Sequence, residues 1–101
     1  MNQKRLPNTE YLELYGRDTA VAFEGSIMVS TPDEIDRNSD KIKITVGSTG
    51  CQNRNRTLST GDVIEFDAGK KGKFEVRLLK ISYCSTTSAY TNARLSVTKL
   101  A

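Results

Sequence analysis

The feature of this sequence that most constrains its fold is an alternation of apolar and polar side chains with a period of two residues. The clearest example is residues 41–46, in which Ile42, Ile44 and Val46 alternate with polar side chains. Successive side chains of an extended strand point to opposite faces, so this pattern predicts strands that each bury one face. Runs of the same kind are found at residues 11–15, 20–30, 73–83 and 93–98. Residues 58–66 predict a turn at Gly61 and Asp62 that leads into a strand with Ile64 and Phe66 facing inward.

The connections between these runs favour one class of fold. All of them are too short to hold the helical crossovers that parallel strands need. We therefore predict an all-β domain: a small antiparallel β-sandwich or partly closed barrel of six to seven strands, with at most one short helical turn. Residues 1–10 are polar and lack any period, and we expect a flexible N-terminal arm there, followed by a single β-domain at residues 11–101.

Two of the predicted strands contain an irregularity. In residues 20–30, Gly25 occupies a position on the face predicted to point inward, and it marks a bend or a close approach of another segment. The side chains predicted to share this face are Val21, Phe23, Ile27 and Val29. Residues 73–83 change phase midway, because Phe74, Val76 and Leu78 share one parity whereas Leu79, Ile81 and Tyr83 share the other. A β-bulge near Leu78 would let both sets face the same interior.

The segment that follows residue 30 contains a helix-start signal. Thr31 is suited to cap a helix, Pro32 to occupy its first position and Glu34 to complete a capping box. We therefore expect a single helical turn, followed by a loop. Acidic and amide side chains at alternate positions of this segment resemble the start of a calcium-binding loop, but Lys41 occupies the position at which an EF-hand requires glycine. We predict no metal site.

The sequence contains no histidine, and this absence limits the chemistry open to the chain. Histidine is the commonest general base, a partner in many nucleophile pairs and a ligand in most mononuclear zinc sites. Asp62, Glu65 and Asp67 are close along the chain, but Asp62 follows a glycine and is better explained by turn chemistry. We therefore predict that the protein is not an enzyme and binds no cofactor.

The two cysteines, Cys51 and Cys84, are 33 positions apart and cannot form a CxxC redox pair. The charged amino terminus is not followed by the apolar run of a secretory signal, and no apolar run is long enough to cross a membrane. We therefore expect a location in the reducing cytoplasm, where both thiols stay reduced. The alternative, a disulfide, requires both cysteine-bearing loops to fall at the same end of the domain, which follows if residues 57–66 act as one strand.

A polar stretch at residues 47–57 is the best candidate for a ligand site. Its glycines allow backbone N–H groups to point inward, and Arg54 and Arg56 have the chemistry to clamp an anion such as the phosphate of a nucleotide. Ser48, Thr49 and Asn53 would supply further hydrogen bonds. The stretch is no P-loop, since neither Gly-Lys-Ser/Thr nor a helix follows it. An ordinary polar connection between strands has the same composition, and this interpretation stays open.

Basic side chains are concentrated in the second half of the chain. Residues 1–50 hold six basic and eight acidic side chains, whereas residues 51–101 hold nine basic and four acidic ones. A basic face on the predicted strands and their hairpin would consist of Lys70, Lys71, Lys73, Arg77 and Arg94. Such a face suits single-stranded nucleic acid. Aromatic side chains are scarce near these residues and the net charge is only +3, so a solvated face is the favoured interpretation.

The hypothesis that we prefer is a non-catalytic interaction module that binds a protein partner or other copies of itself. The apolar side chains of Ala20, Ala22 and Met28 lie near the charged Glu24, which indicates a surface that is not designed for water alone. A domain of this size buries a modest fraction of its surface, so self-association would add stability. The alternatives are binding of an anionic small molecule by the polar loops and binding of nucleic acid by the basic face.

Overall fold

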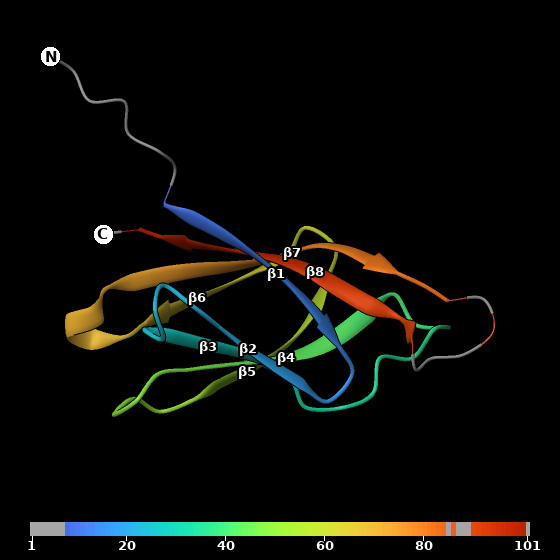
Figure 1. Ribbon diagram of the computed structural model, residues 1–101, viewed down its shortest axis with the longest axis horizontal. Helices are drawn as coiled ribbons and strands as arrows, with labels where there is room; N and C mark the ends of the chain where they lie inside the picture. The colour runs from blue at the N-terminus through green and yellow to red at the C-terminus, as the bar shows by residue number, and fades with distance from the viewer. Residues whose placement is uncertain (1–7, 85, 87–89, 101) are drawn as a thin grey trace, which may run out of the picture.

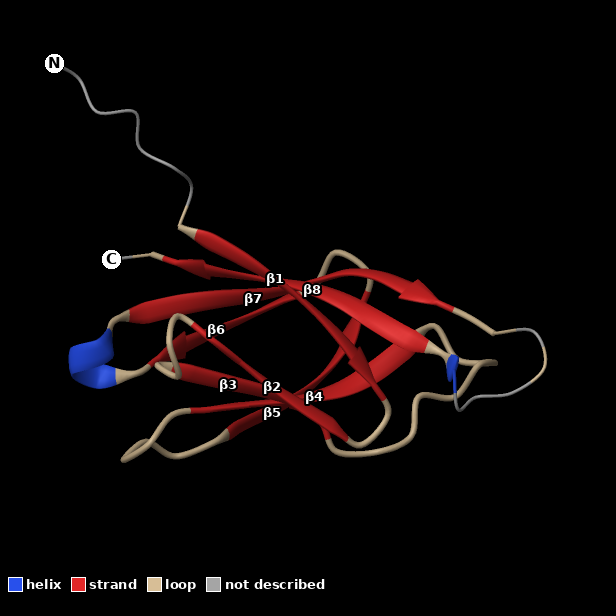
Figure 2. Cartoon of the chain, in the orientation of Figure 1, coloured by secondary structure: helices blue, strands red, loops and turns tan. Residues whose placement is uncertain are grey.

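The chain folds into two antiparallel four-stranded sheets that pack face to face (Figure 1; Figure 2). The computed structural model describes residues 8–84, 86 and 90–100. Within this part of the chain, the strands are β1 (Thr9–Tyr15), β2 (Asp18–Ala22), β3 (Ile27–Thr31), β4 (Lys41–Gly47), β5 (Arg54–Ser59), β6 (Val63–Asp67), β7 (Lys73–Ser82) and β8 (Asn92–Lys99), and a short 3₁₀ turn, η1 (Gly69–Lys71), lies between β6 and β7. The predicted all-β class and antiparallel sandwich are confirmed, and the sheets do not close into a barrel.

The two sheets differ in strand order. Sheet A has the order β1-β8-β7-β6, so its first and last strands in the sequence pair, and sheet B has the consecutive order β2-β3-β4-β5. Edge strand β1 of sheet A contacts edge strand β2 of sheet B, and β5 contacts β6 in the same way. The sandwich therefore has two corners, β1/β2 and β5/β6, at which an edge strand of one sheet lies near an edge strand of the other.

The core lies between the sheets and is made by the alternate side chains that the sequence pattern identifies. In β4, Ile42, Ile44 and Val46 are buried while Lys41 and Lys43 are exposed. The predicted inward residues that are buried in the other strands include Ile27, Val29, Ile64, Phe66, Phe74, Val76, Leu78, Ala93, Leu95 and Val97. Burial of each large side chain contributes about 1.5–3 kcal/mol, so this interior is the main source of stability.

The single strand predicted at residues 20–30 is wrong, because the chain reverses there into the hairpin of β2 and β3. The turn is closed by the Ser26 N–H, which donates to the Phe23 carbonyl oxygen at 3.0 Å. The φ angles of Glu24 (+57°) and Gly25 (+87°) are both positive, as in the tight turns that match the twist of a hairpin. Gly25 therefore belongs to a turn and not to a bend within a strand.

This reversal changes which side chains of the segment face the core. Val21, predicted inward, points outward and is 58% exposed, whereas Ala22 is buried. Phe23 still packs against the core, with its ring centroid 5.4 Å from that of Phe74. The hairpin also brings the number of strands among the described residues to eight, above the six or seven predicted.

The helical turn predicted from the capping-box signal at Thr31 is also wrong. Thr31 is the last residue of β3, and its hydroxyl donates to the Tyr15 carbonyl oxygen at 2.5 Å instead of capping a helix. The same hydroxyl oxygen accepts the N–H of Asp18 at 3.1 Å. Beyond this point the chain is irregular, and it buries Ile35 in the core. Tertiary packing therefore overrides the local helix signal.

The predicted bulge in β7 is confirmed. Leu78 lies opposite Leu95 and Lys80 lies opposite Arg94, so Leu79 is the extra residue of β7. Its predicted inward position is wrong, because Leu79 follows the buried Leu78 and faces outward, where it is 38% exposed. The bulge places Lys80 on the same outer face and so returns Ile81 to the interior.

Beyond the bulge, β7 buries only part of its second predicted inward set. Ile81 is buried, but Tyr83 follows the end of the strand and is exposed. The Tyr83 hydroxyl donates to the Ser39 carbonyl oxygen at 2.6 Å. This bond ties the end of β7 to the segment that precedes β4.

The two cysteines lie at opposite ends of the sandwich. Residues 57–66 are divided between β5 and β6, so they are not the single strand that would bring the two polar loops together. The β4–β5 loop, which holds Cys51, lies beside the β2–β3 turn, where the Ser48 hydroxyl donates to the Ser26 carbonyl oxygen at 2.8 Å. β7 ends at the opposite end of the sandwich (Figure 1), and Cys84 is two residues beyond its last residue, so no disulfide joins the two cysteines.

The described residues cover only part of the predicted amino-terminal arm. Residues 1–7 lie outside the described residues. β1 begins at Thr9, so the last two residues of the predicted arm belong to a strand. Among the described residues, no helix has the length and apolar character needed to cross a membrane.

A tight contact at Gly16 holds the β1–β2 turn against the segment before β4. A side chain at this position would place its Cβ 2.7 Å from the Glu34 Cα and 2.9 Å from the Ile35 nitrogen. We expect Gly16→Ala to lower the free energy of unfolding by about 1–3 kcal/mol, because backbone must shift to admit the methyl group. Urea denaturation measures the difference.

The matched control is Gly25→Asn. Gly25 has a positive φ but open space around it, and asparagine visits this conformation more readily than most residues. Because a side chain at this φ is strained even in open space, we expect this variant to cost up to about 1 kcal/mol, which is less than the backbone clash at Gly16 costs. An unchanged stability of Gly16→Ala would contradict the inferred close approach.

Candidate functional site

Arg54 and Arg56, predicted to clamp an anion from a loop, lie instead on strand β5 at the β5/β6 corner. They share the strand face of the buried Leu58, so they point toward the opposite sheet. Arg54 Nη1 donates to the Glu65 carbonyl oxygen at 2.8 Å, and Arg56 Nη1 donates to the Val63 carbonyl oxygen at 2.9 Å. Both acceptors belong to β6, so the two guanidinium groups bond the backbone of sheet A from sheet B.

The surroundings of Arg54 do not favour an anionic ligand. A hollow of about 200 Å³ at this corner is lined by Arg54 and Lys73 together with Glu65 and Asp67. The two carboxylates offset the attraction that the basic side chains would exert on a phosphate group.

Ser48, Thr49 and Asn53, the other predicted ligand residues, lie away from the two arginines. They line a hollow of about 280 Å³ with Val21, Gly25 and Met28 on the outer face of sheet B. No charged side chain lines this hollow. The structure thus divides the predicted anion site into an arginine pair at a corner and a neutral hollow on a sheet.

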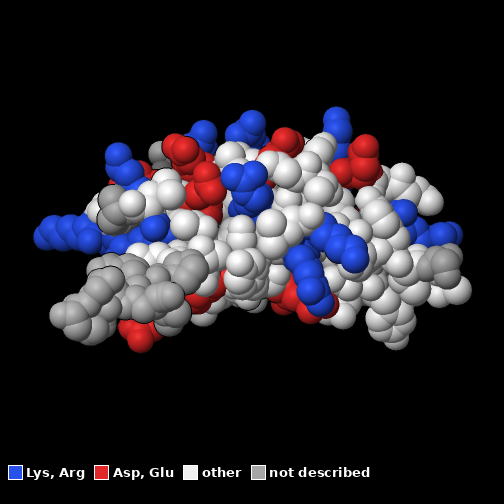
Figure 3. Space-filling model, turned by 90° about the horizontal axis from the view of Figure 1, so that it is seen from above, with Lys and Arg blue, Asp and Glu red and all other residues white. Residues whose placement is uncertain are grey.

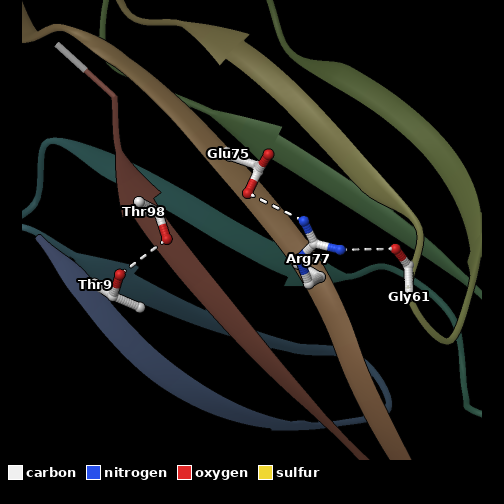
Figure 4. Close-up of polar contacts among 5 residues, drawn as sticks. All are labelled: Thr9, Gly61, Glu75, Arg77 and Thr98. Atoms are coloured by element: carbon white, nitrogen blue, oxygen red, sulfur yellow. Dashed lines mark hydrogen bonds and ion pairs between the residues drawn. The ribbon is translucent and has the colours of Figure 1, made fainter. Parts of the chain in front are cut away.

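The residues predicted to form a basic face are spread over one end and one face of the molecule. Lys70 and Lys71 lie in η1, whereas Lys73, Arg77 and Arg94 lie on β7 and β8. Arg77 Nη2 lies 3.5 Å from Glu75 Oε1, and its Nη1 donates to the Gly61 carbonyl oxygen at 3.1 Å (Figure 4). Figure 3 shows Lys and Arg side chains interspersed with Asp and Glu on the side of the molecule formed by sheet A.

The carboxylates near residue 62 have structural roles. Asp62 Oδ2 accepts the N–H of Ser59 at 2.9 Å, as expected from turn chemistry, and Asp67 Oδ1 accepts the N–H of Gly69 at the same distance. In the part of the chain that the structure describes, no group of three or more His, Cys, Asp or Glu side chains is placed to hold a metal ion.

A different surface, which the sequence pattern did not reveal, combines exposed apolar and charged side chains. We call it the outer face of sheet A. It includes Thr9, Tyr11, Glu13 and Tyr15 of β1, Arg94, Ser96 and Thr98 of β8, Lys73, Glu75, Arg77, Leu79 and Lys80 of β7, and Val63, Glu65 and Asp67 of the edge strand β6. Tyr11 is 72% exposed. Together with Glu13, Leu79 and Arg94, it lines a hollow of about 350 Å³ on this face.

The strand register places these side chains in two rows across β1, β8 and β7. One row is Tyr11, Ser96 and Arg77, and the next is Glu13, Arg94 and Lys80. Ser96 is only 8% exposed although it points outward, so the longer side chains on both sides cover it. Thr9 and Thr98 join β1 to β8 in the adjoining row through a 3.0 Å hydroxyl–hydroxyl bond (Figure 4).

Two signals in the sequence pointed toward this surface. In residues 11–15 the leucines and tyrosines alternate, so burial of the leucines requires the tyrosines to face water. The phase change in β7 predicted the bulge but placed Leu79 among the inward residues, whereas Leu79 faces outward. The proximity of Tyr11 and Leu79 depends on the pairing of β8 with both β1 and β7, which no local pattern reveals.

Comparison of the chain with models of protein families, with curated proteins and with solved structures finds no match. The function is therefore inferred from the geometry of the chain itself.

The two arginines at the β5/β6 corner provide a test of their structural role. We expect the double variant Arg54→Ala, Arg56→Ala to lower the free energy of unfolding by about 1–2 kcal/mol, because it removes two hydrogen bonds to β6. Hydrogen exchange of β6 amides should also accelerate. Chemical denaturation and exchange measured by mass spectrometry check both effects.

The control is Lys70→Ala, Lys71→Ala, which removes the same charge from an exposed turn and should leave both quantities near wild type. Equal effects of the two double variants would contradict a specific role for the corner. A melting temperature that rises with inorganic phosphate in the wild type, but not in the arginine variant, would instead support anion binding.

Proposed function

We propose that this chain is a non-catalytic interaction module and that the outer face of sheet A is its protein-binding surface. The observation that carries the proposal is the exposure of Tyr11 and Leu79 around a hollow bordered by Glu13 and Arg94. Tyrosine and arginine are enriched in the energetically important parts of protein interfaces, and a charged rim around an apolar centre is typical of them.

The bulge in β7 supports this assignment. The bulge places two consecutive residues, Leu79 and Lys80, on the outer face while Leu78 and Ile81 remain buried. One of these two outward residues is apolar, and its side chain lines the same hollow as an exposed tyrosine. Exposing apolar side chains side by side brings no benefit to the isolated domain, whereas a partner would bury them.

The hydrogen bonds at the corners of the sandwich favour a sheet face, and not a strand edge, as the binding surface. Partners that add a strand need an edge with unpaired backbone groups. At the β5/β6 corner, two carbonyl oxygens of β6 already accept hydrogen bonds from Arg54 and Arg56. At the β1/β2 corner, the N–H of Phe23 donates to Glu10 Oε1 at 3.0 Å.

Anion binding and nucleic-acid binding receive less support. The predicted anion residues are divided between two hollows, and the one that holds Arg54 also contains Glu65 and Asp67. Acidic side chains likewise lie among the basic ones on the outer face of sheet A (Figure 3). They weaken the continuous positive potential that a phosphate backbone requires.

Site-specific photocrosslinking tests the proposal for a protein partner of any identity. A photoreactive phenylalanine analogue is incorporated in place of Tyr11, and the full chain is irradiated in the cells that express it. We expect discrete crosslinked products of defined mass, because a specific partner covers this position. Mass spectrometry of the products identifies the attached protein.

The matched control places the same analogue at Val21, an exposed apolar position on the outer face of sheet B. It should give weak or diffuse products. Crosslinks of equal pattern from both positions, or none from position 11, would contradict the assignment of the binding surface to sheet A.

A further inference from the structure

We infer that the partner for the outer face of sheet A is a second copy of the same chain, packed face to face about a two-fold axis close to β8. This inference rests on the proposed function and names the occupant of its surface. It follows from the order of charged and aromatic side chains across β1, β8 and β7.

The register determines which side chains would meet. β8 lies between β1 and β7, so a two-fold axis along β8 places β1 of one copy over β7 of the other. In the row formed by Tyr11, Ser96 and Arg77, each Tyr11 then faces the Arg77 of the second copy. In the next row, each Glu13 faces the Lys80 of the second copy.

Both contacts are favourable, and because of the two-fold symmetry each of them occurs twice in the dimer. A guanidinium group above a tyrosine ring makes a cation–π contact. Arg77 is held in place for this contact by Glu75 and by the Gly61 carbonyl oxygen (Figure 4), which reduces the conformational entropy lost on association. Glu13 and Lys80 have opposite charges, and the ion pair that they form would lie at the margin of the hollow.

The remaining side chains are compatible with this arrangement. Leu79 lies next to Lys80 in β7, so it would face the part of β1 between Tyr11 and Glu13 and bury its exposed apolar surface there. Arg94 lies at the axis, so it would face the Arg94 of the second copy, and the two positive charges would repel each other. Glu13, its register partner on β1, provides a neighbouring negative charge within the same chain, which moderates the repulsion.

The size of the surface sets the strength of the contact. Three strands about 4.8 Å apart and about seven residues long give a planar footprint of roughly 350 Å² per copy. This value is well below the roughly 800 Å² per partner that a standard specific interface buries. We therefore expect a weak dimer, with a dissociation constant on the order of 100 µM.

The outer face of sheet B is a weaker candidate for the same contact. Its exposed apolar residues are Val21 and Met28, and they lie next to each other across β2 and β3. The only basic side chains that point outward there are Lys41 and Lys43 of β4, and no acidic side chain of these described strands shares their face. Lys43 Nζ lies 3.5 Å from Asp33 Oδ2 of the segment before β4, so the acidic partner of this lysine lies outside the strand rows and is already engaged within the chain. The strands of this face therefore lack opposite charges in register that would pair two copies.

Charge reversal tests the predicted pairing directly. Sedimentation equilibrium of the purified chain between about 10 µM and 1 mM should follow a monomer–dimer equilibrium. Glu13→Lys alone and Lys80→Glu alone should each weaken the dimer at least tenfold, because each replaces two attractive pairs with two repulsive ones. An equimolar mixture of the two variants should associate much more tightly than either variant alone, because both pairs between positions 13 and 80 of the two different chains are again of opposite charge.

The control is Lys41→Glu, an equal charge reversal at an exposed position of sheet B, which should leave the dissociation constant unchanged. Circular dichroism of all variants verifies that they are folded. The inference is overturned if the wild type stays monomeric at 1 mM, if the mixture associates no better than the single variants, or if Lys41→Glu weakens the dimer equally. A monomeric wild type that still gives discrete crosslinks from position 11 to another protein would overturn the second copy as partner and leave the proposed function standing.

Discussion

An open sandwich must satisfy the backbone hydrogen-bonding groups along its edge strands, and in this molecule side chains meet that requirement. At the β5/β6 corner, Arg54 and Arg56 donate to carbonyl oxygens of β6. At the β1/β2 corner, Glu10 accepts the N–H of Phe23, and Thr31 bonds the backbone on both sides of the turn. These contacts join the sheets where no backbone ladder continues, and they protect edges that would otherwise pair with other chains.

Closure of the corners limits how the domain can associate. With several backbone groups at both corners already bonded to side chains, a partner gains less from adding a strand there, and the outward faces offer the larger surfaces. The two faces differ, because sheet A presents aromatic, aliphatic and oppositely charged side chains in register, whereas the strands of sheet B present mainly hydroxyl and amide groups with two lysines and a few apolar residues. The asymmetry between the faces follows from the same alternation that builds the core, since each inward position leaves its neighbour to face solvent.

The sequence allowed the strands and most of the core to be predicted, because burial of Ile42 and its equivalents depends only on local alternation. It did not reveal the hairpin at Gly25, since the apolar parity continues through the turn. The helical turn predicted at Thr31 was wrong because a helix cap and a hydroxyl that bonds the backbone at the end of a strand require the same residue type. Arg56 was predicted to lie in a loop because a polar edge strand has the same amino-acid composition as a loop. The surface near Leu79 requires pairing between distant strands, and periodicity contains no information about such pairing.

The strand order of sheet A has a consequence for the path by which the chain folds. Every pair in sheet B joins strands that are consecutive in the sequence, so short loops close it at low entropic cost. β1 has no neighbour within sheet A except β8, and their register joins Thr9 to Thr98 across 89 positions. Such distant contacts form late and slow the overall rate. We therefore expect sheet B to provide the nucleus, and the docking of β1 on β8 to be the last and slowest event of folding.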